Sequence, residues 1–266
     1  MQDYVSGEDI SEDEAYIVQD TEGEDPIFFD EAVKCTKWRQ AMDAEINSII
    51  KNKTWTLTDL PAHYKTIGVK WIYKTKRDEK GDIVKHKARL VAKGYSQKEG
   101  IDYTEVYAPV ARMDTVRMII SVAAHKGWKI MQLDVKSAFL HRELIEDVYV
   151  EQPRGYESKG KKHMVYKLHK ALYGLKQAPR AWFSRIERHF LDEGFEENRN
   201  EHTLFTKRSK EGRIVIVSLY VDDLIITGDD EELIAKFKSS LIKQFDMTDL
   251  GGMSYFLGIH RTKELC

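Results

Sequence analysis

Residues 213–228, with the sequence RIVIVSLYVDDLIITG, decide the fold of this chain. Two β-branched apolar runs flank a pair of aspartates, and short runs of this composition are typical of buried strands rather than helices. The stretch therefore predicts a β-hairpin with Asp222 and Asp223 in its tight turn. Adjacent carboxylates at the tip of an apolar hairpin repel each other, so we expect a bound cation to neutralise them.

An acidic pair is also ordinary turn chemistry, because Asp tolerates turn conformations. The upstream stretch IMQLDVKSAF at 130–139 favours a site instead, since it carries the lone Asp134 in a mostly apolar run. A third carboxylate on a neighbouring strand would complete a two-metal site, in which cations about 3.5–4 Å apart clamp the oxygens of a phosphoryl transfer. Hard oxygen ligands of this kind suit Mg²⁺.

The composition is that of a globular chain, with 266 residues of which 42% are hydrophobic and 32% charged. This length suits one large or two small domains. The sequence shows no apolar run long enough to span a bilayer and no start typical of a secretory signal. We therefore expect a cytoplasmic or nuclear protein that is not secreted and has no membrane partner, whose Cys35 and Cys266 stay free thiols.

Charge is unevenly distributed along the sequence. Residues 1–31 contain 12 acidic residues and no Lys or Arg, which leaves 32 of the 44 acidic residues against all 42 basic ones in residues 32–266. The acidic leader lacks helical periodicity, so we expect it to be disordered. The basic remainder suits a polyanionic partner, because phosphates neutralised by Lys and Arg release counterions. A merely solvated basic surface is the alternative interpretation.

Hydrophobic spacing predicts the remaining elements. Asp30 and Asp114 are the expected caps of the first two of four helices, at 30–50, 114–127, 179–193 and 229–244. Strands are expected at 55–58, 68–74, 83–91, 163–169 and 255–259, and a turn at 249–252. Lys85, Lys87 and Arg89 alternate along one strand and so share a face, which is either a solvated edge or a binding surface.

Three motifs carry a specific resemblance: LDVKSAFLH at 133–141, LYGLKQAPRAW at 172–182 and YVDD at 220–223. In this order and spacing they resemble the reverse transcriptases of copia-type LTR retrotransposons. Further landmarks of that family are KARLVAKGY at 87–95, APVAR at 108–112, EQPRGY at 151–156 and YFLGI at 255–259. The resemblance extends from about residue 38 to about residue 258.

This resemblance implies an α+β, right-hand polymerase fold, with fingers and an antiparallel palm sheet present and the thumb largely missing. Residues 1–31 would be an acidic linker after the integrase region of a polyprotein. The fingers would comprise about 32–109 and 142–176, the palm about 110–141 and 177–259, and residues 260–266 a truncated tail. The implied location is the cytoplasm, within a virus-like particle, or the nucleus.

The resemblance also implies the roles of residues around the metal ions. Asp134, Asp222 and Asp223 would be catalytic and would bind two Mg²⁺ ions, for which Mn²⁺ could substitute. Asp222 would be the essential bridging ligand and Asp223 more peripheral. The carbonyl of Val135 would complete the metal ligands.

Nucleotide binding is implied for the residues that follow Asp134. The amides of Ser137 and Ala138 would approach the triphosphate, and the ring of Phe139 would crowd a ribose 2′-hydroxyl and so favour deoxynucleotides. Without the motif around it, Phe139 would be interpreted as a core aromatic. Gly174 stands where the backbone comes close to a ligand or turns sharply; here Tyr173 replaces the Gln that retroviral relatives carry.

Two further sets of residues are implied to hold the substrates. Lys74 and Arg89 would grip the triphosphate, with Lys76 or Lys87 as substitutes if the alignment slips. The primer terminus would be positioned by the four residues Tyr255, Phe256, Leu257 and Gly258.

The expected function is therefore RNA-directed DNA polymerisation on an RNA or DNA template with a primer and deoxynucleoside triphosphates. The alternative is a catalytically inactive nucleic-acid-binding remnant, because a missing thumb would remove a clamp on the duplex. A third hypothesis, RNA-dependent RNA polymerisation, is disfavoured by Phe139. The sequence predicts no particular oligomeric state.

Overall fold

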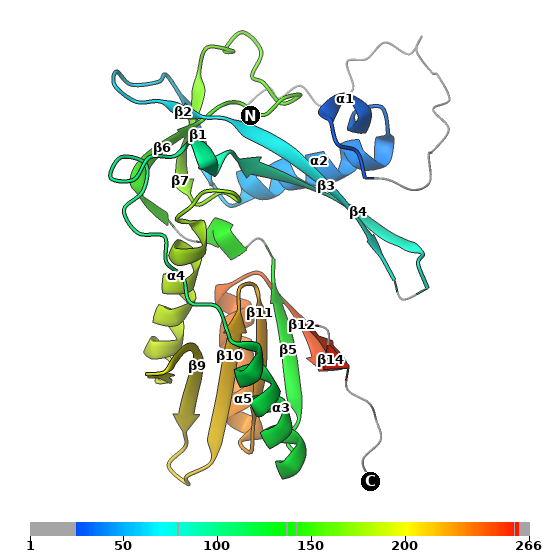
Figure 1. Cartoon of the computed structure of the whole chain (residues 1–266), viewed down its shortest axis with the longest axis vertical. Helices are drawn as coiled ribbons and strands as arrows, with labels where there is room; N and C mark the ends of the chain where they lie inside the picture. Colours follow the sequence, from blue (N-terminus) through cyan, green and yellow to red (C-terminus); the bar gives the residue numbers. More distant parts are fainter. Residues whose placement is uncertain (1–24, 79, 137, 142, 258, 261–266) are drawn as a thin grey trace. The chain divides into compact units, whose positions relative to one another are not determined.

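A computed structural model of the chain describes residues 25–78, 80–136, 138–141, 143–257 and 259–260. It is a mixed α/β structure with several sheets, which confirms the expected fold class at this level (Figure 1). The chain forms two compact units, Met1–Val106 with Arg142–Ala181, and Tyr107–His141 with Trp182–Cys266. Among the described residues, every helix is too short or too polar to cross a bilayer.

The first unit is built on the hairpin of β3 (Val69–Arg77) and β4 (Ile83–Ala92), which α2 (Thr36–Lys51) covers on one face. A short helix, α1 (Phe29–Ala32), precedes α2 and begins within the range 1–31 that was expected to be disordered. The prediction of a single helix at 30–50 is therefore wrong, because the helical conformation is interrupted between α1 and α2, and Cys35 is the N-cap of α2. Ile49 rather than Ile50 is buried, because it continues the stripe of buried residues Trp38, Met42 and Ile46.

A second sheet completes the first unit. It contains β1 (Trp55–Thr58), β7 (Val165–Lys170), β6 (Glu143–Val150) and β2 (Thr66–Ile67) in that spatial order. The β2–β6 pair is parallel and the others are antiparallel. The strands expected near 55–58 and 163–169 are confirmed as β1 and β7.

The second unit is built on a six-stranded antiparallel sheet. Its spatial order is β12 (Met247–Gly252), β5 (Ile130–Val135), β11 (Asp223–Gly228), β10 (Ile214–Tyr220), β9 (Glu201–Arg208) and β8 (Glu196–Asn198). The expected turn at 249–252 is wrong, because these residues belong to β12. The pairing of β12 with β5 shifts register between Asp249 and Gly251, and glycine is typical of such a bulge in a strand.

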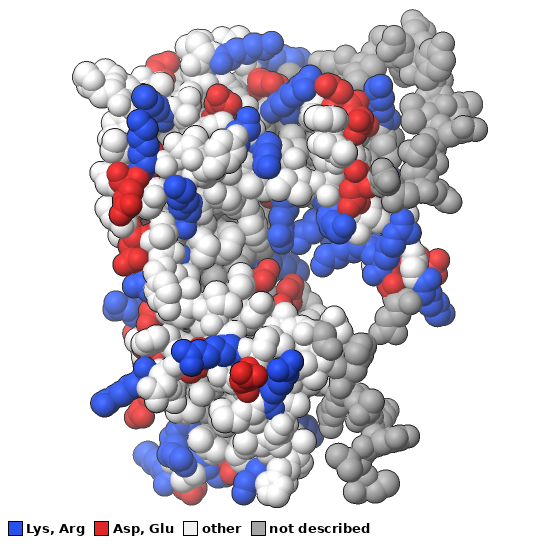
Figure 2. All heavy atoms as spheres, viewed as in Figure 1, with Lys and Arg blue, Asp and Glu red and all other residues white. Residues whose placement is uncertain are grey.

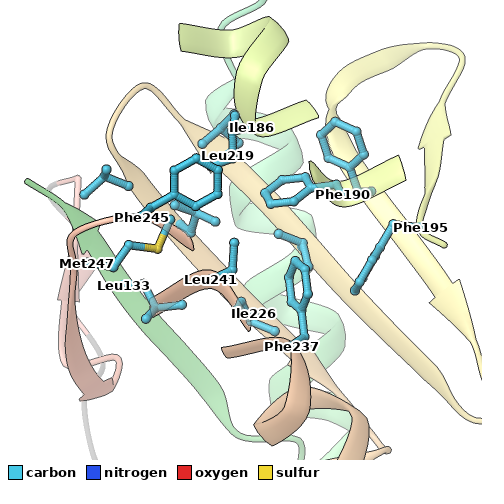
Figure 3. Packing of buried hydrophobic residues seen from close by; sticks show 14 of the residues in the cluster. Leu133, Ile186, Phe190, Phe195, Leu219, Ile226, Phe237, Leu241, Phe245 and Met247 are labelled. Carbon is cyan, nitrogen blue, oxygen red and sulfur yellow. The ribbon is translucent and has the colours of Figure 1, made fainter. Parts of the chain in front are cut away.

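Helices cover both faces of this sheet (Figure 1). On one face lie α5 (Glu231–Gln244) and α4 (Ala178–Asp192), whose first turn belongs to the first unit. Figure 3 shows how Ile186 and Phe190 of α4 and Phe237 of α5 pack with Leu133 and Leu219 of the sheet in a core of aromatic and aliphatic side chains.

The opposite face is covered by α3 (Met113–Lys126), which ends at the left-handed Gly127 (φ 68°) as expected. Its N-cap is Arg112, so the expected cap Asp114 instead lies in the first turn, where it opposes the helix dipole favourably. The chain then ends its described part in a small hairpin of β13 (Tyr255–Phe256) and β14 (Ile259–His260), so the single strand expected at 255–259 is wrong.

Candidate active site

The turn between β10 and β11 has an unusual backbone. Tyr220 pairs with Asp223, which leaves Val221 and Asp222 as a two-residue loop. Of these two, only Val221 has a positive φ, 55°. A positive φ at the first central residue alone defines a type II′ turn, where Gly is the usual residue. A β-branched residue in this conformation is strained by roughly 1–3 kcal/mol.

Two hydrogen bonds from other elements hold this strained turn. The indole N–H of Trp182 in α4 donates to the carbonyl oxygen of Val221 over 2.6 Å. The backbone N–H of Val135 at the end of β5 donates to the carbonyl oxygen of Asp222 over 2.9 Å. Both carbonyls of the loop are therefore fixed from outside the hairpin. The sequence indicated only a supporting role for the helix of Trp182 and gave no signal for this contact.

Asp134 and Asp223 lie directly opposite each other on β5 and β11. Their chain neighbours Leu133 and Leu224 are buried in the core beneath α4 and α5. Because side chains alternate along a strand, both carboxylates point to the other face of the sheet. Like charges in directly opposite positions destabilise a sheet. With Asp222 in the adjoining turn, the structure thus gathers the three predicted carboxylates at one end of two neighbouring strands.

This carboxylate group, Asp134, Asp222 and Asp223, is only partly buried. In the part of the chain that the structure describes, no three or more His, Cys, Asp or Glu side chains are arranged closely enough to hold a metal ion by themselves. Mg²⁺, however, is commonly bound by one or two carboxylates together with water and substrate phosphates. The all-oxygen donor set fits a hard divalent cation, and the opposed pair of Asp134 and Asp223 gives that cation a role.

The residues after Asp134 lead into the core of the second unit. Val135 and Ala138 are buried there, and Phe139 is partly buried against the same cluster. Lys136 is held by its backbone N–H, which donates to the carbonyl of Asp246 over 2.8 Å. Ser137 lies outside the described residues. The nucleotide-binding and steric-gate roles of this segment stay predictions.

Gly174, in the first unit, is required by close backbone packing. Its φ is +88°, and a Cβ at this position would lie 2.2 Å from the carbonyl oxygen of Ala92. The N–H of Ala92 in turn donates to the carbonyl of Tyr173 over 2.7 Å. The sequence indicated either a close ligand or a sharp turn at this glycine, and the structure shows close packing against Ala92 of β4. A nucleotide contact of Gly174 stays a prediction.

Basic side chains gather along the β3–β4 hairpin (Figure 2). Strand alternation and the register place six of them on the face opposite α2, namely Lys70, Lys74 and Lys76 of β3 and Lys85, Lys87 and Arg89 of β4. The register places Lys74 opposite Lys87 and Lys76 opposite Lys85, which are like-charge pairs. Lys74 forms an ion pair with Asp25 at 3.1 Å. The structure therefore brings together the four cations nominated from the sequence, Lys74, Lys76, Lys87 and Arg89, on one basic face.

Arg89 makes a contact that the sequence did not indicate. Its guanidinium lies over the ring of Tyr173, 4.3 Å from the centroid, which is a cation–π geometry. Tyr173 is the residue that replaces Gln in the motif at 172–182. The aromatic substitution therefore gives Arg89 a fixed neighbour within the first unit.

The segment predicted to position the primer forms the β13–β14 hairpin. Tyr255 is 51% exposed, whereas Phe256 is buried in the core beneath α3. Leu257 has a positive φ of 47° in the connecting turn. Gly258 lies outside the described residues. The primer-positioning roles of these residues stay predictions.

Comparison with known proteins identifies the family. Residues 52–265 match the profile of the family described as reverse transcriptase (RNA-dependent DNA polymerase). The chain is 45% identical over 225 residues to the retrovirus-related Pol polyprotein from transposon TNT 1-94 of Nicotiana tabacum, covering 85% of this chain and 17% of the relative. It is 43% identical over 231 residues to the corresponding polyprotein from transposon RE1 of Arabidopsis thaliana, covering 86% and 16%.

A more distant relative is the transposon Ty1-H Gag-Pol polyprotein of Saccharomyces cerevisiae, 31% identical over 224 residues, with 79% of this chain and 11% of the relative covered. The chain thus spans about one sixth of the length of the plant polyproteins. The motifs at 133–141, 172–182 and 220–223 all lie inside the matched region. The chain belongs to the reverse transcriptase (RNA-dependent DNA polymerase) family, on the branch of the copia-type retrotransposon Pol polyproteins.

Proposed function

We propose that this chain is an RNA-directed DNA polymerase domain that transfers nucleotides onto a primer 3′-hydroxyl by two-metal chemistry. The observation that carries the proposal is the pairing of Asp134 directly opposite Asp223, beside a strained turn that contains Asp222. Like charges directly opposite each other destabilise a sheet, and a bound cation would offset this repulsion. Membership of the family supplies the reaction class.

Asp134, Asp222 and Asp223 would hold two Mg²⁺ ions, with the Val135 carbonyl as a further ligand. When bound, such ions ease deprotonation of the primer hydroxyl and neutralise charge on the triphosphate. The primer 3′-oxygen then forms a bond to the α-phosphorus, while the bond from that phosphorus to the pyrophosphate oxygen breaks. Asp222 would be the essential ligand of the hairpin pair; its backbone carbonyl accepts the N–H of Val135, which holds the residue beside the strained Val221.

The basic face of the β3–β4 hairpin would bind phosphate. Lys74 opposite Lys87 and Lys76 opposite Lys85 repel each other, and a polyanion or a triphosphate would relieve this repulsion. The ion pair of Lys74 with Asp25 is the kind of contact that a phosphate would replace. We assign Lys74 and Arg89 to the triphosphate, together with the amides of Ser137 and Ala138.

The division of the chain supports an assignment to fingers and palm. The first unit corresponds to the proposed fingers, about 32–109 and 142–176, and the second to the proposed palm, about 110–141 and 177–259. The carboxylates belong to the second unit and the basic hairpin to the first. In this assignment Phe139 selects deoxynucleotides, and Tyr255 with Phe256, Leu257 and Gly258 positions the primer terminus.

A second candidate function is binding of nucleic acid without extension. The basic face favours it, because that face suits phosphates whether or not the carboxylates hold metal ions. The two functions differ in their dependence on the carboxylates: binding would survive the loss of Asp222, whereas extension would not.

Primer extension tests the proposal. The full chain is incubated with Mg²⁺, dTTP and a poly-rA template primed with oligo-dT, and the Asp222→Asn variant serves as control. We expect extension by the wild type alone, with equal duplex binding by both proteins. Binding without extension in both would favour the second function, and extension by Asp222→Asn would exclude the assignment of the metal ligands.

A further inference from the structure

We infer that Trp182 is a positioning residue, whose indole N–H fixes the central peptide of the turn that presents Asp222 to the opposed pair of Asp134 and Asp223. The inference rests on the proposed function for its catalytic consequence. Its structural part, a hydrogen bond that selects one turn type, can be tested without catalysis.

The geometry of Trp182 suits a rigid clamp. Its indole nitrogen lies 2.6 Å from the carbonyl oxygen of Val221, and the residue is 2% exposed. The ring packs edge-on against Phe245, with centroids 5.5 Å apart and an interplanar angle of 86°. Indole N–H is only a donor, so the buried ring has one way to satisfy its polar atom. Here it does so on the turn.

The carbonyl that Trp182 holds is the one that decides the turn type. In a two-residue hairpin loop the carbonyl of the first residue belongs to the central peptide, and flipping this peptide converts a type II′ turn into type I′. Type I′ requires a positive φ at both loop residues, whereas type II′ requires it only at the first. The bond to Val221 therefore keeps Asp222 out of the left-handed region and fixes the direction of its side chain.

Val221 gives the turn no intrinsic preference that would replace this bond. Glycine at the first loop position favours type II′ by itself, but a β-branched residue with φ 55° is strained in either turn. Val221 is 39% exposed, so burial of this residue does not account for the strained conformation. The strain must be held by the surrounding bonds, namely those from Trp182 and Val135 and the strand pairing.

The experiment combines Trp182→Phe, which keeps an aromatic ring and removes the N–H, with Val221→Gly, which makes type II′ the favoured turn. Urea unfolding, Mn²⁺ affinity and steady-state extension are measured for wild type, both single variants and the double variant. Trp55→Phe is the matched control, because the buried indole N–H of Trp55 has no hydrogen-bond partner among the residues that the structure describes.

We expect Trp182→Phe to raise the unfolding equilibrium constant about 5-fold, the size of one lost hydrogen bond. We also expect Mn²⁺ affinity and kcat to fall about 5-fold, with KM for dTTP changed less than 2-fold. In the Val221→Gly background each of these losses should shrink to less than 2-fold. Trp55→Phe should leave Mn²⁺ affinity and kcat unchanged.

Equal effects of Trp182→Phe in both backgrounds would overturn the inference, because the indole would then stabilise the core without acting on the turn. So would a Trp182→Phe variant with wild-type Mn²⁺ affinity and kcat. If the wild type neither binds Mn²⁺ nor extends a primer, the proposed function fails. In that case the double-mutant cycle of unfolding free energies still tests the structural part of the inference. Coupling between Trp182→Phe and Val221→Gly supports the role of the indole in the turn, and additive effects exclude it.

Discussion

Replacing Asp223 by Asn should stabilise the metal-free protein and destabilise the metal-loaded protein relative to wild type. Asp223 lies directly opposite Asp134, and Cβ atoms in such pairs are about 4.5–5.5 Å apart. Two unit charges about 5 Å apart repel by roughly 0.8 kcal/mol at the dielectric constant of water and roughly 3 kcal/mol at an effective value of 20. Both carboxylates are partly exposed, so we expect a repulsion of about 1 kcal/mol.

Metal binding should reverse this order. A cation present at ten times its dissociation constant stabilises the folded chain by about 1.4 kcal/mol. Asp223→Asn removes one ligand, so the variant should gain less from Mg²⁺ than wild type does. A change of 1 kcal/mol shifts the midpoint of thermal unfolding by about 2–4 °C in a chain of roughly this size. The variant should therefore melt a few degrees higher in EDTA and lower at saturating Mg²⁺.

Thermal unfolding followed by circular dichroism, in EDTA and in Mg²⁺, measures both differences. The control is Glu196→Gln, which removes an exposed carboxylate from β8 at the far edge of the same sheet and should respond like wild type in both buffers. The reasoning is refuted if Asp223→Asn melts lower than wild type in EDTA, or if Mg²⁺ raises the midpoints of both proteins equally.

Three further predictions concern the first unit. Lys87→Gln should reduce the slope of log K for duplex binding against log salt concentration by about 0.9, which corresponds to one phosphate contact. Replacing the exposed Lys162 by Gln should leave the slope unchanged. Equal slopes for the two variants would contradict a basic binding face. Burial raises the pKa of Glu45, whose carboxylate accepts the N–H of Leu90. Folding therefore disfavours the charged form, and Glu45→Gln should raise the unfolding midpoint at pH 7. This advantage should disappear below pH about 4.5, where the Glu45 carboxyl of the wild type is also neutral. A midpoint difference independent of pH would contradict this. Gly174→Ala should lower the free energy of unfolding in urea by about 2 kcal/mol or more, because the new Cβ would lie 2.2 Å from the carbonyl oxygen of Ala92 in a residue with φ +88°. A loss under about 0.5 kcal/mol would contradict the close packing.

The sequence predicted the local elements around the carboxylates well. Unbroken apolar runs identified β10, β11 and β5, and the prediction that Asp134 lies on a strand next to the hairpin is confirmed by the pairing of β5 with β11. Apolar spacing located α3, α4 and α5 to within about two residues. Strong local periodicity was sufficient in these segments, because burial of one face decides both the element and its orientation.

Features that depend on tertiary contact could not be predicted. The two glycines of β12 indicated a turn, and only pairing with β5 makes that segment a strand. The bond from Trp182 to Val221 joins residues 39 positions apart, and neither residue type signals it. Likewise, the close approach of Gly174 to Ala92 follows from packing, so the sequence could show that a special backbone was needed but not its cause.

The acidic leader shows the same limit. Its composition indicated disorder up to residue 31, yet α1 begins at Phe29, within this range, and residues 1–24 lie outside the described part. Phe29 packs where a Cβ on Gly155 would otherwise lie, and Asp30 pairs with Arg154 at 2.7 Å. Counting charges predicts the average behaviour of a segment, whereas individual side chains at its end can still find specific partners.

Electron paramagnetic resonance of Mn²⁺ bound to the full chain, with a primed template whose 3′ end lacks the hydroxyl and with dTTP, tests the two-metal claim most directly. Two ions about 3.5–4 Å apart are magnetically coupled, so we predict a coupled-pair spectrum in wild type that is lost in Asp134→Asn. A spectrum of isolated Mn²⁺ in wild type, identical to that of Asp134→Asn, would contradict the claim that Asp134, Asp222 and Asp223 form a two-metal site.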